Sequence, residues 1–266
     1  MVKERDKKRA EKLYFALVKH MNISKNPSTD SLPYQIIFIP GLLLTADLFE
    51  AQIADLPIGQ SYMVADTTAS DSIQHMAERA AGQADPEFVA IGLSMGGYVA
   101  MELARLYPER VKGVGFLSTN SSSETEERRK IRQELINLSK IGKFKGVTPR
   151  LLPRLLSEQA LQDKILTSSI MNMAADIGQE NFVLQQTAIM HRLDQRPHLP
   201  DMTVPSLVLC GTADELTPPA QSEETASQLP DAELQILDGI GHLSSMEAPE
   251  AVNAALRRLY QRIEAR

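Results

Sequence analysis

A serine between glycines follows a short apolar run in the first half of the chain. Residues 88–97 read Phe-Val-Ala-Ile-Gly-Leu-Ser-Met-Gly-Gly, and the β-branched run predicts a buried strand that stops at Gly92. Gly92, Ser94 and Gly96 then match the G-x-S-x-G pattern of a sharp strand-to-helix turn. Such a turn places the serine hydroxyl at a helix N-terminus, where free N–H groups favour developing negative charge. The pattern predicts a nucleophilic Ser94, although glycine and serine also form ordinary turns.

A serine nucleophile needs a base within hydrogen-bond reach and a third group that orients the base. Of the five histidines, only His242 lies in a glycine-flanked loop that follows a predicted strand. Asp214 lies just past the end of another predicted strand, although an aspartate before a helix is also an ordinary cap and Glu215 is its neighbour. The order Ser94, Asp214, His242 is the nucleophile–acid–base order of G-x-S-x-G hydrolases. We therefore predict these three as catalytic residues.

Acyl transfer also requires hydrogen-bond donors for the oxyanion. One donor is expected to be the backbone N–H of the residue after the nucleophile, Met95. The second should come from the loop after the first strand, which contains Pro40, Gly41 and Leu42. Proline cannot donate, and glycine permits the tight turn, so the Leu42 amide is the predicted second donor.

The rest of the chain supplies strands and helices that can carry these loops. Strands are expected at Gln35–Ile39, Tyr62–Ala65, Phe88–Ile91, Gly113–Leu117, Ser206–Cys210 and Glu233–Leu237. Helices are expected at Ala46–Leu56, Ser70–Ala84, Gly96–Leu106 and Pro218–Gln228, and from Pro249 onward. Alternating strands and helices predict an α/β fold with a mostly parallel sheet of about six strands and helices on both faces.

The alternation stops between residues 121 and 200. Ser123 and Glu126 have the spacing of a capping box, and further helices are expected at Leu161–Ala175 and Gln179–Arg192. So much helix between two strands is too long for a simple crossover, so 121–200 is predicted to be an inserted helical cap that acts as a lid. The predicted core is 34–120 and 201–266.

Three apolar side chains are candidates for an acyl pocket. Leu43 lies in the loop of the predicted oxyanion donor, and Met171 and Met173 lie in the predicted cap. The alternative is that leucine and methionine side chains simply fill the core. The sequence leaves both interpretations open.

Composition limits the classes of function. The 266 residues carry a formal net charge of −6, which argues against nucleic acid as a partner. The single cysteine, Cys210, allows no disulfide within the chain, and no apolar run is long enough to span a bilayer. We therefore expect a cytoplasmic protein with a small-molecule substrate. Residues 1–33 read as a charged extension and linker, whose helix contacts the domain, contacts another subunit, or frays in solvent.

Taken together, these segments resemble the α/β-hydrolase superfamily, in particular its small capped esterase-like members. The matching segments are Pro40-Gly41-Leu42, Gly92-Leu93-Ser94-Met95-Gly96-Gly97, Gly211-Thr212-Ala213-Asp214 with Pro218, and Gly241-His242-Leu243 with Glu247-Ala248-Pro249-Glu250. They extend over residues 34–266. Two features depart from the pattern: Pro40 stands where many members have histidine, and the usual N-terminal strand pair is missing.

The resemblance implies a Ser94 nucleophile, an Asp214 acid, a His242 base and an oxyanion hole from Leu42 and Met95, with no metal or organic cofactor. The predicted activity is hydrolysis of an ester with a small or medium, partly apolar acyl group through an acyl-enzyme. The same triad could act on another bond, as in a C–C hydrolase, lactonase, amidase or acyltransferase. A non-catalytic ligand-binding protein of this fold is the remaining alternative.

Overall fold

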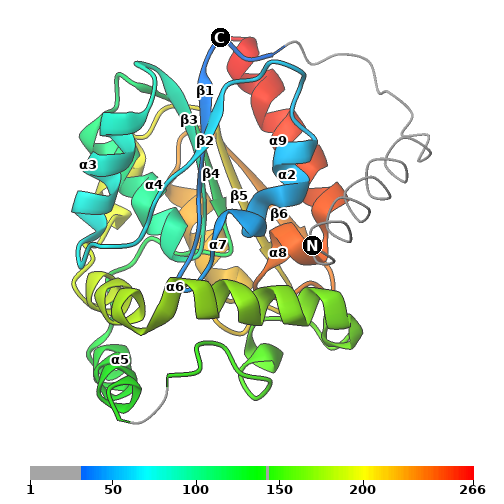
Figure 1. Cartoon of the computed structure of the whole chain (residues 1–266). Coiled ribbons are helices and arrows are strands. Elements are labelled where there is room, and N and C mark those ends of the chain that lie inside the picture. The colour runs from blue at the N-terminus through cyan, green and yellow to red at the C-terminus, as the bar shows by residue number, and fades with distance from the viewer. Residues whose placement is uncertain (1–30, 142–143) are drawn as a thin grey trace, which may run out of the picture.

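A six-stranded parallel sheet forms the centre of the molecule (Figure 1). The computed structural model describes residues 31–141 and 144–266, so the prediction of an N-terminal helix lies outside the described residues. The strands are β1 (Gln35–Ile39), β2 (Tyr62–Val64), β3 (Phe88–Leu93), β4 (Val111–Leu117), β5 (Ser206–Gly211) and β6 (Ala232–Leu237). Their order in the sheet is β2-β1-β3-β4-β5-β6, and every neighbouring pair is parallel. The predicted sheet is confirmed.

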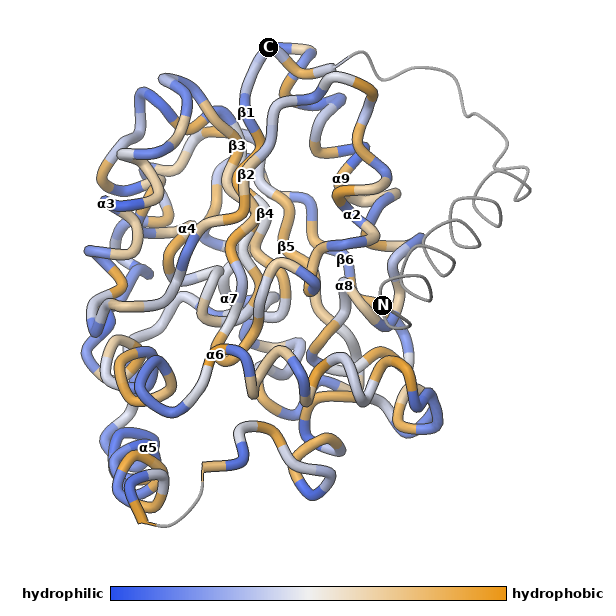
Figure 2. Tube along the Cα trace, in the orientation of Figure 1, coloured by the Kyte–Doolittle hydropathy of each residue, from blue (hydrophilic) through white to orange (hydrophobic). Residues whose placement is uncertain are grey.

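Helices cover both faces of this sheet, as predicted (Figure 1). One face carries α2 (Glu50–Ala54), α8 (Ser244–Glu247) and α9 (Pro249–Glu264); the other carries α3 (Ile73–Gln83), α4 (Met95–Leu106) and α7 (Pro219–Gln228). Alternate residues of β1 point to opposite faces. Ile36 and Phe38 pack in the core beneath α9, whereas Ile37 and Ile39 pack in the core beneath α3 and α4. Figure 2 shows the apolar residues gathered along the central strands.

The strand order determines where a ligand can bind. The chain leaves β1 to form β2 on one side and then returns to form β3 on the other side of β1. In open α/β sheets, ligands bind outside the carboxyl ends of the strands at such a reversal. The loop that follows β1 contains Leu42, and Ser94 follows β3 directly. The fold therefore brings the predicted oxyanion donor and the predicted nucleophile to the same crevice.

The long segment between β4 and β5 is mainly helical. It contains α5 (Glu126–Ser139) and α6 (Lys164–Met190), with short 3-10 helices before and after α6. The predicted capping box is wrong: the side chain of Thr125, not Ser123, accepts the hydrogen bond of the Arg128 amide (3.2 Å). Gly178 interrupts α6 with φ 76, a conformation that glycine adopts without steric cost, so the two helices expected there join at this residue.

Helix α6 crosses the edge of the sheet where the strands end, and α5 lies beyond it (Figure 1). Ile170 and Met173 of α6 are almost fully buried in the same core as the sheet residues. In the part of the chain that the structure describes, no helix is long and apolar enough to cross a membrane.

Candidate active site

Backbone contacts explain the glycines around Ser94. A Cβ on Gly92 would lie 2.1 Å from the carbonyl oxygen of Gly96, and a Cβ on Gly96 would lie 1.9 Å from the carbonyl oxygen of Ile39. Real Cβ atoms do not approach so closely, so helix α4 can pack against β1 and β3 only with glycine at both positions. Ser94 itself has φ 56 and ψ −116, a strained conformation for a residue with a side chain. The predicted strand-to-helix turn is present.

Neighbouring strands hold Ser94 in this conformation. Its amide donates to the carbonyl oxygen of Leu117 (2.9 Å), and the hydroxyl of Thr119 donates to its carbonyl oxygen (2.8 Å). Ser94 precedes the first residue of α4, and its side chain makes no capping hydrogen bond. The hydroxyl is therefore not engaged in stabilising the helix, and it faces a cavity.

His242 and Asp214 form a buried pair. Nδ1 of His242 lies 3.0 and 2.9 Å from the two carboxylate oxygens of Asp214, and each residue is 3% exposed. Asp214 also accepts hydrogen bonds from the amides of Leu216 and Thr217 (both 2.9 Å) and from the Thr217 hydroxyl (2.7 Å). The adjacent Glu215, the rival acid, is exposed. Of the two neighbouring carboxylates, that of Asp214 is the one that contacts the imidazole.

The environment of Asp214 favours its charged form. Burial alone would raise the pKa of this carboxyl. The hydrogen bond from His242, the charge that His242 carries when protonated, and the hydrogen bonds from Thr217 outweigh burial and hold the pKa of Asp214 below its usual range. An ionised Asp214 can stabilise an imidazolium during proton transfer.

The loop of His242 is fixed by the segment that precedes α6. The amide of His242 donates to the carbonyl oxygen of Leu155 (3.0 Å). Glu247 links the same two segments, because its Oε2 accepts hydrogen bonds from the amides of Gly241 (3.2 Å) and Ser157 (3.0 Å). The position of His242 thus depends on residues of the insertion.

The loop after β1 is fixed by α6. Leu43 has φ 61, and its amide donates to Oε1 of Gln185 (3.0 Å). Nε2 of Gln185 donates to the carbonyl oxygen and the hydroxyl of Thr67 (3.2 and 3.3 Å), and the side chain is fully buried. Among the described residues, the amide of Leu42 has no hydrogen-bond acceptor, as an oxyanion donor requires. Sequence reasoning missed Gln185, because nothing in a helical glutamine identifies a contact 142 positions away.

A cavity of about 550 Å³ connects these groups. Ser94, His242, Leu42 and Leu43 all line it, together with residues of α5 and α6. A volume of this size suits a small organic ligand. Met171 and Met173 are not among its lining residues; Met173 is 1% exposed, and its sulfur accepts the amide of Thr45 (3.5 Å). Core packing describes Met173 better than a pocket wall.

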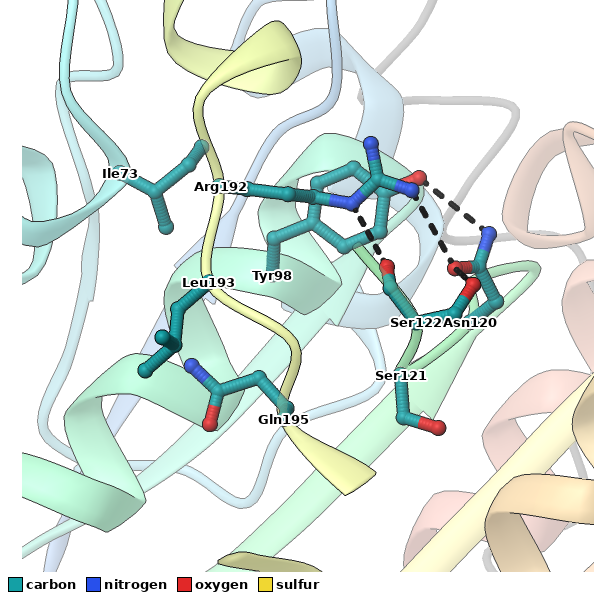
Figure 3. A pocket seen from close by; sticks show the side chains of 8 residues that line it. All are labelled: Ile73, Tyr98, Asn120, Ser121, Ser122, Arg192, Leu193 and Gln195. Atoms are coloured by element: carbon teal, nitrogen blue, oxygen red, sulfur yellow. Dashed lines mark hydrogen bonds between the residues drawn. The ribbon is translucent and has the colours of Figure 1, made fainter. Parts of the chain in front are cut away.

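A second polar cluster lies where the insertion rejoins the sheet (Figure 3). The guanidinium of Arg192 lies 4.3 Å from the centre of the Tyr98 ring, and its Nε donates to the carbonyl oxygen of Ser122 (3.0 Å). Arg192 also pairs with the buried Glu124 (3.0 Å). The space inside the cluster is about 10 Å³, room for about one water molecule. The cluster therefore ties the insertion to α4 rather than binding a ligand.

No group of three or more His, Cys, Asp or Glu side chains within 31–141 and 144–266 is placed to hold a metal ion.

Comparison with known proteins gives a family and a fold. The family model for serine aminopeptidase S33 matches residues 59–249. The chain is 31% identical over 171 residues to "Putative carbamate hydrolase RutD" of Serratia proteamaculans, a match that covers 62% of each protein. It is 28% identical over 211 residues to the pimeloyl-[acyl-carrier protein] methyl ester esterase of Yersinia enterocolitica, covering 76% of this chain and 80% of that one. The match thus spans about three fifths of the first relative's length.

Solved structures share the fold. A thermophilic esterase from Thermogutta terrifontis superposes with a TM-score of 0.79 at 24% identity, covering 88% of this chain and 91% of the esterase. The enol-lactonase of Burkholderia xenovorans superposes with a TM-score of 0.74 at 20% identity, covering 88% and 92%. At these identities the likeness is one of fold.

Proposed function

The chain belongs to the α/β-hydrolase family, and from this premise we propose that it hydrolyses esters of small or medium, partly apolar acyl groups through an acyl-enzyme. The observation that carries the proposal is the buried His242–Asp214 pair, with Nδ1 within 3.0 Å of both carboxylate oxygens, in one cavity with the strained Ser94. A buried carboxylate bonded to an imidazole, in the same cavity as a serine whose hydroxyl makes no capping hydrogen bond, supports nucleophilic catalysis.

The proposed reaction assigns one step to each group. Because Nδ1 of His242 is bonded to Asp214, Nε2 accepts the proton of Ser94 as Oγ attacks the acyl carbonyl carbon. The amides of Leu42 and Met95 donate to the resulting oxyanion. The imidazolium then gives its proton to the departing alkoxide, which leaves an acyl-serine. A water molecule, deprotonated by His242, attacks the carbonyl carbon of this ester; the imidazolium then returns the proton to Oγ of Ser94 as the acyl–oxygen bond breaks, which releases the acid and restores the serine.

We assign the helical segment 121–200 as a cap, with 34–120 and 201–266 as the catalytic core. Lining residues of the cavity support this division, because they come from α5 and α6 as well as from the sheet edge. The core supplies the groups that react, and the cap supplies most of the apolar wall.

A lactone or carbamate is the second candidate substrate. The name of one relative refers to a carbamate hydrolase and that of one structural neighbour to an enol-lactonase, and both support this candidate, whereas the methyl ester esterase among the relatives supports the ester. All three substrates present a carbonyl carbon to a nucleophile. Rates on a panel of esters, lactones and carbamates of matched size will rank them.

Labelling with a fluorophosphonate probe tests the nucleophile. The purified chain should react, and Ser94→Ala should abolish both labelling and ester hydrolysis while leaving the melting temperature nearly unchanged. Ser139→Ala is a matched control, because Ser139 lines the same cavity but donates its hydroxyl to the carbonyl oxygen of Ile136 (2.7 Å). If the Ser94→Ala protein is still labelled, or hydrolyses esters at the original rate, the proposal fails.

A further inference from the structure

The cavity carries a charge opposite to that of the protein. Among the residues that the structure describes, four cationic side chains line it, those of Arg128, Arg132, Lys145 and Arg154, against the single carboxylate of Glu215. The whole chain has a formal net charge of −6. A local excess of positive charge in the cavity of an acidic protein raises the local concentration of anions.

Most of these cations are available to a ligand. Arg132 is engaged, since it pairs with Glu124 (2.5 Å) and donates to Gln186 (2.7 Å). Arg128, Lys145 and Arg154 form no ion pair with any other described residue. An arginine without a carboxylate partner presents a planar fork of N–H donors that fits a carboxylate or phosphate.

The cations and the nucleophile come from different parts of the fold. Arg128 belongs to α5, and Arg154 belongs to a 3-10 helix (Leu152–Arg154) of the insertion. Ser94 directly follows β3, at the carboxyl end of that strand. Helix α6 lies between the carboxyl ends of the strands and α5 (Figure 1). Apolar side chains of the same cavity, including Ile131, Leu135 and Phe182, accompany them. The cavity lining therefore combines Ser94 from the core with apolar side chains and with cations from the insertion.

We infer that the site takes esters whose apolar acyl chain carries an anionic group, a carboxylate or a phosphate, at the end remote from the scissile carbonyl. The inference rests on the proposed function and specifies its substrate class. The carbonyl lies at Ser94, the methylene chain lies against the leucine and phenylalanine side chains, and the terminal anion binds Arg128 and Arg154. A charge-assisted hydrogen bond to such an anion favours it over a neutral chain end by about tenfold or more.

Matched esters test the inference. We would compare kcat/KM for three p-nitrophenyl esters of equal chain length: a dicarboxylic acid monoester with a free carboxylate, the neutral fatty acyl ester, and the ester with a terminal ammonium. A fourth ester with a terminal phosphate separates the two anion chemistries. The anionic esters should be preferred over the neutral ester by about tenfold, the ammonium ester should be poorest, and added salt should reduce the preference.

Variants locate the preference. Arg128→Gln and Arg154→Gln should each lower the ratio of anionic to neutral kcat/KM, and Arg128→Lys should retain part of it. Lys130→Gln is the control, because Lys130 is an exposed cation of α5 outside the cavity lining, and it should leave the ratio unchanged. If a glutamine variant fails to fold, the salt dependence of the unmodified chain decides.

The outcomes separate two failures. An unmodified chain that hydrolyses anionic and neutral esters equally well, or a ratio that does not respond to Arg128 and Arg154, overturns the inference while the serine hydrolase stands. A chain that hydrolyses none of the esters and escapes the fluorophosphonate overturns the proposed function itself.

Discussion

Replacing Gln185 with leucine will test how the insertion controls the oxyanion loop. Leucine has nearly the volume of glutamine but removes the acceptor of the Leu43 amide and the donor to the Thr67 carbonyl oxygen. Both partners then lose their hydrogen bond in a fully buried site, which costs about 1–3 kcal/mol each. We therefore expect a loss of about 2–6 kcal/mol in the free energy of unfolding.

The rate should fall as well, because the hydrogen bond from its amide to Gln185 helps to hold Leu43 at its strained φ of 61. Relaxation of Leu43 would displace the preceding amide, that of Leu42, which we propose as an oxyanion donor. The loss of one oxyanion donor costs about 2.7–4 kcal/mol in activation free energy, or about a hundredfold to a thousandfold in kcat. The KM should change little, because the interaction forms in the transition state.

The assay measures kcat, KM and urea unfolding on the same preparation. Gln186→Leu is the matched control: Gln186 is buried beside Gln185 on α6 and accepts a hydrogen bond from Arg132, but within the described residues its side chain makes no hydrogen bond to the loop after β1. Both variants should lose stability, and only Gln185→Leu should lose about two orders of magnitude in kcat. If the two variants retain the same kcat, the reasoning about the oxyanion loop is refuted.

Five other substitutions have defined outcomes. Asp214→Asn should reduce kcat by about ten-thousandfold with the fold retained, as a rate and circular-dichroism comparison will show. Burial alone would raise the pKa of Glu124, but the arginines around it outweigh burial and lower that pKa. The carboxylate therefore stabilises the fold above its unfolded pKa, and this contribution is lost as the pH falls through the folded pKa. The urea midpoint of Glu124→Gln should accordingly lie below that of the unmodified chain at pH 7 and converge with it in acid. Gly96→Ala should abolish folding because of its 1.9 Å contact, whereas Gly82→Ala, with open space around it in α3, should raise stability by up to about 1 kcal/mol. Met173→Ala should cost about 2–5 kcal/mol without altering the ranking of acyl lengths, and a changed ranking would return Met173 to the pocket.

The fold could be predicted because its signals are local. Short apolar runs and intervening helical patterns gave all six strands, and only the ends differed: β4 begins at Val111 rather than at the predicted Gly113. The glycines around Ser94 were informative because a backbone collision, rather than a preference, requires them. The capping box failed because Ser123 and Thr125 compete for the same helix start, and sequence spacing does not show which hydroxyl reaches the amide.

The groups that hold the site could not be predicted. The positions of Asp214 and His242 after predicted strands made them recognisable in the sequence. Gln185 and Glu247, by contrast, bond to residues that lie 142 and 90 positions away in the sequence. The sequence around a helical glutamine does not show whether its side chain is buried and bonded to another segment or exposed to solvent. Such partners emerge only once the insertion is placed over the ends of the strands.

The position of the insertion over the strand ends bears on which part of the predicted lid could move. Gln185 bonds the loop of the predicted oxyanion donor to α6, and the carbonyl oxygen of Leu155 bonds the amide of His242 to the segment before α6. A movement of these two parts of the insertion would break hydrogen bonds of both reactive loops at once. α5 has neither bond, and its Ile131, Leu135 and Leu138 are exposed beside the cavity. A movement of α5 alone would leave both of these hydrogen bonds in place, but it would break those that join α5 to α6, from Arg132 to Gln186 (2.7 Å) and from Arg129 to the carbonyl oxygen of Met190 (3.1 Å).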